Sequence, residues 1–471
     1  MKKTFLTLTI IIGIISCNQT SENTKLNVAH SEKSQKLDSL YTEMLKYGEF
    51  NGNVLIAEND TIVLQKSYGI ANMDNNQPLT ENSIFNLASV TKQFTATAIY
   101  LLVKEGKLSF DDEMSKYIPE LDFYNGITIN HLVHHTSGLP DYMRIFDEKG
   151  DKSRIATNDY VIKLFAKEKP ELKFEPNEKW AYSNTGYFLL ASIIERVSKK
   201  SYGGFLKEKI FKPLEMNETN VYFVYKNSVK IDNLALGYST DSTGTYVSHN
   251  DYAKSFDGVY GQGRMYSTTL DLYKWSKGLK NNKLLSEEDT KTLFSNSKLN
   301  SGQSTDYGLG WFLKDGEAHK DYVAHSGRWA GYITYIEKHF DKDITIILLQ
   351  NNGNGTGKTR IPIKNTQKIL YDQPIEKTLR LPDEIQEKYA GIYVSEKGNE
   401  KEIIFKDKSL WFVMNPKMKF ELMPDTETKF IVNGFRPKVT YEFILDGNGD
   451  VEKYRVRQPE QGVDRIAIRK K

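Results

Sequence analysis

The order of secondary-structure patterns predicts an α+β protein: one antiparallel sheet flanked by helices, an all-helical subdomain, and a small β-barrel at the C-terminal end. Strand-forming segments open the chain at 53–57 and 61–68 and return at 322–350, with mostly helical sequence after the opening strands. A sheet assembled from both ends of one domain and covered by helices satisfies this order. From residue 389 onward, short strand patterns alternate with turns, which is typical of a small barrel or sandwich.

The elements of the predicted sheet follow from local patterns. Apolar residues recur at helical spacing over 37–47, which indicates an amphipathic helix before the first strand. Glu58-Asn59-Asp60 separates the two opening strands and predicts a hairpin. The closing segment predicts three strands, with turn chemistry at 328–330 and 341–343.

The C-terminal region, 383–471, is predicted to form the barrel. Asn433-Gly434 and Asp446-Gly447 are residue pairs that favour tight hairpin turns. The predicted strands are 391–394, 402–405, 410–414, 429–433, 439–445, 453–458 and 465–469.

The N-terminus has the pattern of a secretory signal over residues 1–16, with two lysines, an apolar stretch and a small-residue end. Residues 14–17 resemble a bacterial lipobox, which implies lipidation of Cys17, the only cysteine of the chain. The alternative is a chance cysteine at the end of a signal peptide. Residues 17–35 would then be a lipidated cysteine and flexible tether. We therefore expect a protein of the bacterial cell envelope, held at a membrane and facing the periplasm or exterior.

Composition limits the class of partner. The net charge is +3 over 471 residues, with interspersed charges and no long basic block. Nothing in this balance points to nucleic acid. A chain of this length can hold a large core, and the patterns predict a main domain over 36–372 before the barrel.

Ser89 and Lys92 are the first and last residues of the tetrapeptide Ser-Val-Thr-Lys at the start of a predicted helix. Because a helix turns once per 3.6 residues, both side chains lie on one face, about one turn apart. A serine hydroxyl is a poor nucleophile until a base takes its proton. Lysine can be that base only if burial or a second cation lowers its pKa from about 10.4 toward neutrality. Since the spacing is common by chance, an ordinary helix start is the alternative.

Two further motifs follow in order. Residues 182–184 read Tyr-Ser-Asn before an apolar helical run, and residues 325–327 read His-Ser-Gly within a strand-like stretch. With the Ser89 tetrapeptide, this order resembles the penicillin-recognising serine hydrolases: class C β-lactamases, serine DD-peptidases and related esterases. The resemblance covers roughly 36–370. It is supported by the segments His135-Thr136-Ser137-Gly138-Leu139, Gly258-Val259-Tyr260-Gly261 and Tyr307-Gly308-Leu309-Gly310-Trp311.

The resemblance implies the same α+β architecture, with a lipocalin-like C-terminal barrel, and a two-step acyl transfer through Ser89. Lys92 and Tyr182 would share the proton transfers, and the sequence leaves open which of them is the base. Asn184 carries an amide that can donate to a substrate carbonyl and accept from Lys92. The resemblance also implies an oxyanion hole built from backbone N–H groups of Ser89 and Arg328.

His325, Gly327 and Arg328 are the remaining candidate substrate-binding residues. β-Lactamases of this family commonly carry lysine at the position of His325, whereas histidine occurs in some DD-peptidases and esterases. A neutral histidine avoids the repulsion that a second ammonium group would exert on Lys92. The alternative is a structural strand histidine. The Arg328 guanidinium is a candidate partner for a substrate carboxylate, as in peptides ending in D-alanine, and its alternative is a solvated loop arginine.

Three patterns that suggest ligands are better explained otherwise, so we expect no cofactor or metal. Residues 351–359 resemble a phosphate loop but have three residues, not four, between Gly353 and the Gly-Lys pair. The histidines at 131, 134 and 135 lack a suitably spaced fourth ligand. Residues 446–450 begin like a calcium loop but lack the later glycine and glutamate.

Three functional hypotheses result. The first is a serine hydrolase that cleaves peptide or amide bonds of small substrates, with D-amino-acid or cell-wall peptides as the natural guess. The second is an esterase or weak β-lactamase of the same fold. The third is a non-catalytic lipoprotein that binds peptides or β-lactams, which would be expected to have lost one of the motifs. The oligomeric state and the role of the barrel stay open.

Overall fold

The computed structural model describes residues 31–470, except 241–245, 249–250, 317–318, 354–359, 377, 416–417, 434 and 436. The predicted signal segment, Cys17 and most of the tether lie outside the described residues, as does most of the phosphate-loop-like segment. Within the described residues, no helix combines the length and the apolar character needed to cross a membrane.

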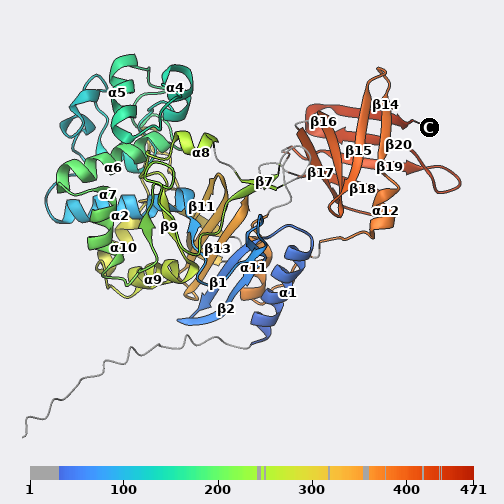
Figure 1. The fold of residues 1–471 in the computed structure, drawn as a ribbon, viewed down its shortest axis with the longest axis horizontal. Helices are drawn as coiled ribbons and strands as arrows, with labels where there is room; N and C mark the ends of the chain where they lie inside the picture. The colour runs from blue at the N-terminus through green and yellow to red at the C-terminus, as the bar shows by residue number, and fades with distance from the viewer. Residues whose placement is uncertain are drawn as a thin grey trace, which may run out of the picture.

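The central sheet is antiparallel along its main path and joins both ends of the main domain, as the sequence predicts (Figure 1). Its strands pair in the order β10-β11-β12-β13-β1-β2, so the first two strands of the chain pair with the last of the closing segment. The bounds are β10 Phe312–Gly316, β11 His319–Trp329, β12 Gly331–His339, β13 Ile344–Gly353, β1 Gly52–Glu58 and β2 Thr61–Tyr68. All ten residues of β13 are buried, and the apolar run Ile346–Leu349 lies at the centre of the strand.

Two layers cover this sheet (Figure 1). One face packs against α1 Glu32–Lys46 and α11 Ile363–Leu370, which share an apolar cluster that includes Leu37, Tyr41 and Ile369. Ser31 caps α1 by accepting a hydrogen bond from the Ser34 amide at 3.2 Å. The other face packs against α9 Thr269–Lys280 and the larger core of the helical region.

The helical region supplies the elements around the catalytic motifs. Its central helix, α2 Thr91–Lys104, is buried on nearly every side and contacts α6 Asn184–Ser198. A helix surrounded by protein needs no polar face, which agrees with its high apolar content. The other helices are α3 Ile129–Val133, α4 Tyr142–Lys149, α5 Asn158–Glu168, α7 Tyr202–Leu206, α8 Asp251–Ser255 and α10 Glu287–Leu293. The minor strands are β3 Ile70–Asn72, β4 Gln77–Pro78, β5 Phe85–Asn86, β6 Asn220–Val221, β7 Tyr238–Thr240, β8 Tyr246–Ser248 and β9 Met265–Ser267.

The C-terminal region is a closed eight-stranded barrel that lies to one side of the main domain (Figure 1). The short helix α12 Asp383–Glu387 precedes it, and the exact limits 36–372 and 383–471 stay predictions. Tyr393, Phe443 and Tyr454 belong to a packed aromatic core rather than to an open lumen. The strands are β14 Gly391–Ser395, β15 Glu400–Lys406, β16 Ser409–Asn415, β17 Met418–Pro424, β18 Lys429–Val432, β19 Thr440–Leu445, β20 Val451–Gln458 and β21 Val463–Arg469.

Local details of the barrel differ from the sequence prediction. Strand β17 was missed, although residues 418–422 alternate apolar and charged side chains as a half-buried strand does. The connection at Asn433 runs from Val432 to Thr440, so it is longer than a two-residue hairpin. The Asp446 turn is a five-residue loop in which the Asp446 side chain accepts from the Asn448 amide at 2.8 Å and the Asp450 amide at 3.0 Å.

A buried charge cluster connects the barrel to the central sheet. Arg360, which follows β13, approaches Glu49 at 3.1 Å and Glu421 of the barrel at 2.9 Å. Arg380 in the linker donates to both carboxylate oxygens of Glu49 at 2.7 Å. Since both glutamate side chains are only 3% exposed, each depends on these arginines for charge compensation.

Candidate active site

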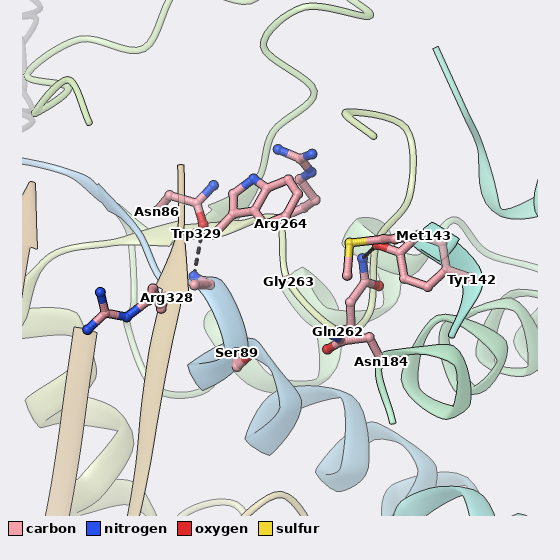
Figure 2. Close-up of a pocket in the computed structure, with 11 residues that line it drawn as sticks. Asn86, Ser89, Tyr142, Met143, Asn184, Gln262, Gly263, Arg264, Arg328 and Trp329 are labelled. Atoms are coloured by element: carbon pink, nitrogen blue, oxygen red, sulfur yellow. Dashed lines mark hydrogen bonds between the residues drawn. The ribbon is translucent and has the colours of Figure 1, made fainter. Parts of the chain in front are cut away.

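Ser89 lies in a tight turn between a short strand and the buried helix α2. The 3₁₀ turn Ala88–Val90 follows β5, and α2 begins at Thr91. Ala88 adopts a left-handed backbone with φ of 48°, and its amide donates to Asn86 Oδ1 at 2.8 Å (Figure 2). A non-glycine residue in this region stores backbone strain, which is common beside reacting groups. The turn places Ser89 in the wall of a cavity of about 60 Å³.

Lys92 is fully buried and is held by three oxygen atoms. Its Nζ lies 3.1 Å from Ser89 Oγ, 2.9 Å from Asn184 Oδ1 and 3.0 Å from the backbone oxygen of Gln262. It also lies 4.7 Å from the centre of the Tyr182 ring. Burial lowers the pKa of Lys92 well below its ordinary value. Among the described residues, no carboxylate forms a salt bridge with it.

Tyr182 approaches Ser89 from the segment that precedes α6. The residue is 37% exposed, while desolvation of its hydroxyl raises the pKa of Tyr182 and a hydrogen bond with Ser89 opposes that rise. The Tyr182 ring packs on His135, with ring centres 4.5 Å apart. His135 Nδ1 accepts the Ser183 amide at 3.0 Å, which fixes the segment carrying Tyr182.

His135 therefore has a positioning role that the sequence did not predict. It is buried with a φ of 62° and contacts three tyrosine rings. Its neighbours also have structural partners: Thr128 N donates to His131 Nδ1, and His134 Nδ1 bonds with Asn130 O. Within the described ranges, no three His, Cys, Asp or Glu side chains gather as metal ligands.

His325 on β11 is buried behind the cavity wall, with an exposed fraction of 1%. Its Nδ1 lies 2.7 Å from the Ser326 carbonyl oxygen, which can only accept, so the proton sits on Nδ1. Nε2 then accepts from the Tyr307 hydroxyl at 3.0 Å. Burial and the nearby Lys92 lower the pKa of His325 to about 3, so its ring is neutral. It contacts Tyr182, with ring centres 6.2 Å apart, rather than lining the cavity.

Gly327 brings β11 against the turn that carries Ser89. A Cβ there would lie 2.5 Å from the Leu87 oxygen and 2.3 Å from Thr334 Oγ1, so only glycine permits this approach. Arg328 follows and lines the cavity, but it is not in a turn as predicted. β11 continues to Trp329, and Ala330 makes the turn with a φ of 46°.

The cavity brings together some predicted residues and several that were not predicted. Ser89, Asn184 and Arg328 line it, whereas Lys92, Tyr182, His325 and Gly327 lie behind or beside its wall. Gln262 was missed, although it directly follows the Gly258–Gly261 segment and its backbone oxygen accepts from Lys92. The unpredicted lining residues are Asn86, Ala88, Tyr142, Met143, Gln262, Gly263, Arg264 and Trp329 (Figure 2).

Comparison with known proteins agrees with this geometry. A family model described as Beta-lactamase matches residues 37–369. The chain belongs to the β-lactamase family. Within this family, it is similar to penicillin-binding protein 4* of Bacillus subtilis (strain 168), with 35% identity over 89% of this chain and 98% of the relative. It is 30% identical to protein flp of Staphylococcus aureus (strain MRSA252), over 72% of this chain and 67% of that protein.

Solved structures extend the likeness beyond the hydrolase part. The octameric penicillin-binding protein homologue from Pyrococcus abyssi matches with a TM-score of 0.65 and 26% identity, over 93% of this chain and 100% of that one. The predicted fold class is thereby confirmed. This β-lactamase-family protein is a serine hydrolase of the penicillin-binding-protein-like group.

Proposed function

We propose that this hydrolase cleaves peptide or amide bonds of small substrates through an acyl-enzyme on Ser89. The observation that carries the proposal is the set of three oxygen atoms around Lys92 Nζ, at 2.9–3.1 Å. Asn184 Oδ1 and the Gln262 carbonyl can only accept hydrogen bonds, whereas the Ser89 hydroxyl can donate one. A neutral lysine amine has two N–H donors and one lone pair. It can therefore donate to the two carbonyl oxygens and accept from the Ser89 hydroxyl.

Proton transfer follows from that arrangement. The lowered pKa leaves a fraction of Lys92 neutral near pH 7, so its lone pair can take the Ser89 proton as the hydroxyl oxygen attacks the substrate carbonyl. Tyr182, which shares a hydrogen bond with Ser89, would pass a proton to the leaving group. Water then attacks the acyl carbon, the same groups move its proton, and Ser89 is released as the acid product leaves.

The oxyanion of each step would be stabilised by the backbone N–H groups of Ser89 and Arg328. Both residues line the cavity, and Gly327 permits the close approach of their two backbones. Preorganised N–H donors of this kind contribute a large part of the catalysis in acyl transfer. His325 would act indirectly, because its neutral ring packs against Tyr182 without adding positive charge near Lys92.

The substrate class rests on two observations. Two relatives that match about nine-tenths of the chain, at 89% and 93%, are named a penicillin-binding protein and a penicillin-binding protein homologue. Arg328 also lines the cavity, where its guanidinium could bind the carboxylate of a peptide that ends in a D-amino acid. We therefore favour D-amino-acid or cell-wall-related peptides. An esterase or weak β-lactamase of the same fold is the alternative, since the neutral His325 replaces the lysine common in β-lactamases.

Intact mass after incubation with a penicillin tests the nucleophile, with Ser89→Ala as the matched control. A persistent adduct on the wild type alone supports Ser89 and a DD-peptidase-like enzyme. Turnover of a D-alanyl dipeptide and of a p-nitrophenyl ester then separates peptidase from esterase. If Ser89→Ala retains wild-type turnover, the proposed mechanism is wrong. If neither substrate nor the drug is changed, a binding lipoprotein becomes the better explanation.

We also propose that Cys17 carries the lipid that holds the enzyme at a membrane of the cell envelope. The support is the sequence pattern of residues 1–17 alone. Metabolic labelling with a fatty acid should mark the wild type and not Cys17→Ser, and the variant should leave the membrane fraction. Equal labelling of both proteins contradicts the proposal.

A further inference from the structure

A buried arginine that the mechanism does not use forms part of the wall of the Ser89 cavity. Arg264 precedes β9 and is 5% exposed, yet it lines the cavity together with Asn86 and Trp329 (Figure 2). The same three residues also line an adjoining cavity of about 80 Å³. Arg264 therefore lies between the two cavities and lines both of them.

The Arg264 guanidinium is held in a fixed orientation. Its Nη2 donates to the Ala253 carbonyl oxygen at 3.0 Å, and its centre lies 5.4 Å from the Trp329 ring. Asp257 lies 3.5 Å from Nη1, which is long for a charge-assisted hydrogen bond. Asp257 is itself held by the amides of Tyr225 and Lys226, at 2.8 and 2.9 Å.

The backbone of Arg264 adopts an unfavourable conformation. Its φ is 77°, in the left-handed region that a non-glycine residue seldom adopts. Gly263, just before it, lies at ordinary van der Waals distance from Ala88, since a Cβ at Gly263 would lie 3.7 Å from the Ala88 oxygen. The strained residue therefore sits against the turn that carries the nucleophile, where such strain often accompanies function.

The charges of the cavity wall indicate the chemistry of the group that it would bind. Arg264 and Arg328 are the charged residues among the described residues that line the Ser89 cavity, and none of those residues is an aspartate or glutamate. A planar guanidinium presents paired N–H donors that match a carboxylate, and in a partly dry site this pairing is stronger than in water.

The position of Arg264 relates it to the acyl part of the substrate. Tyr182, the proposed donor to the leaving group, lies beside Lys92 and does not line the cavity that Arg264 lines. Figure 2 shows Arg264 and Trp329 together at one end of the cavity, with Ser89 at the other. A leaving group beside Tyr182 places the acyl group on the opposite side of Ser89, toward Arg264.

We infer that Arg264 is a specificity-determining residue that selects acyl donors carrying a carboxylate on the acyl side chain. The inference rests on the proposed Ser89 acyl-enzyme and specifies that the preferred acyl group is negatively charged. It is distinct from the pairing of Arg328 with a carboxylate on the leaving group.

Matched esters test this selection. Mono-p-nitrophenyl esters of succinic, glutaric and adipic acids are compared with neutral p-nitrophenyl butyrate, valerate and caproate. At the best chain length, the wild type should show at least tenfold higher kcat/KM for the anionic member, and added salt should reduce that ratio. Ratios near one at all three lengths overturn the inference while leaving Ser89 chemistry intact.

The variants separate a specific role from a structural one. Arg264→Gln alone removes the cationic partner of the buried Asp257 carboxylate. The double variant Arg264→Gln/Asp257→Asn is therefore used, with Asp257→Asn as control. The double variant should lose the anionic preference, whereas Asp257→Asn should keep it and Arg264→Lys should keep part of it. An unchanged ratio in the double variant overturns the inference.

Binding provides a readout that does not depend on turnover. Calorimetry on Ser89→Ala compares the monoamides of the same diacids with the neutral amides of equal length. Tighter binding of the anionic amide, abolished by adding Arg264→Gln/Asp257→Asn, supports the inference even if no ester is hydrolysed. Equal binding of both amides overturns it. Hydrolysis of the esters by Ser89→Ala at the wild-type rate would instead contradict the proposed function.

Discussion

The side chain of Lys92 donates to Asn184 Oδ1 across 2.9 Å, although 92 positions separate the two residues. An amide oxygen stabilises a lysine by hydrogen bonding without supplying the full negative charge that would hold it protonated. Lys92 therefore keeps a pKa well below its ordinary value despite having three oxygen neighbours.

The charge at position 184 should control the pH dependence of acylation. In the proposed mechanism the neutral form of Lys92 is active, so kcat/KM should fall as the pH drops through its lowered pKa. Asn184→Asp places a carboxylate beside Lys92, favours the ammonium form, and should move this acidic limb upward by more than one pH unit. The pH profile of ester hydrolysis measures the shift, with Asn448→Asp in the barrel as control. A limb that stays in place would show that Lys92 is not the base.

Gly327 should be intolerant of a side chain. Gly327→Ala puts a methyl group 2.5 Å from the Leu87 oxygen, so β11 must move away from the Ser89 turn and the proposed oxyanion donors separate. We expect kcat/KM to fall at least 100-fold, as for the loss of an oxyanion donor. Gly447→Ala, where nothing lies within 4 Å, is the matched control and should behave as wild type. Full activity of Gly327→Ala would exclude this packing constraint.

Buried histidines should make the fold sensitive to acid. Burial lowers the pKa of His134 to about 4, against about 6.5 in an unfolded chain. As the pH falls, His134 therefore binds a proton in the unfolded state before it does so in the folded state. The stability of the folded state with neutral His134 is retained above about pH 6.5 and decreases as the pH falls toward 4. For His134 alone the loss between pH 7.5 and 5 is about 2 kcal/mol. In urea unfolding, the free energy of unfolding should fall less between pH 7.5 and 5 in His134→Asn than in the wild type. Equal decreases in the two proteins would contradict a lowered pKa for His134.

Arg360 should stabilise the contact between barrel and sheet. Arg360→Met removes one cationic partner each from Glu49 and Glu421, and breaking a buried pair costs about 3 kcal/mol. Thermal unfolding should show the loss, and Arg360→Met/Glu421→Gln should recover part of it because one uncompensated charge disappears. Lys429→Met, which breaks the more exposed pair with Asp425, should cost about 1 kcal/mol or less. A neutral effect of Arg360→Met would show that other groups, such as Arg380 beside Glu49, compensate the two glutamates without Arg360.

The sequence was sufficient wherever a short-range pattern carries the information. The Ser89 and Lys92 spacing places both side chains on one helical face, and the hairpin around Glu58-Asn59-Asp60 joins β1 and β2 as predicted. The antiparallel sheet and the barrel followed from the order of strand patterns. Strand β17 was missed although residues 418–422 show the alternation of apolar and charged side chains that is typical of a strand.

The sequence by itself thus determined the family and the fold class and pointed to the residues proposed to carry acyl transfer, because these depend on residue type and order. Only the tertiary structure decided which groups face the substrate cavity. It buried His325 against Tyr307, brought the Gln262 carbonyl to Lys92 and placed Arg264 in the wall opposite Ser89. These contacts join residues from separate elements, and burial, charge and pKa arise from the whole packed environment and not from neighbours along the chain.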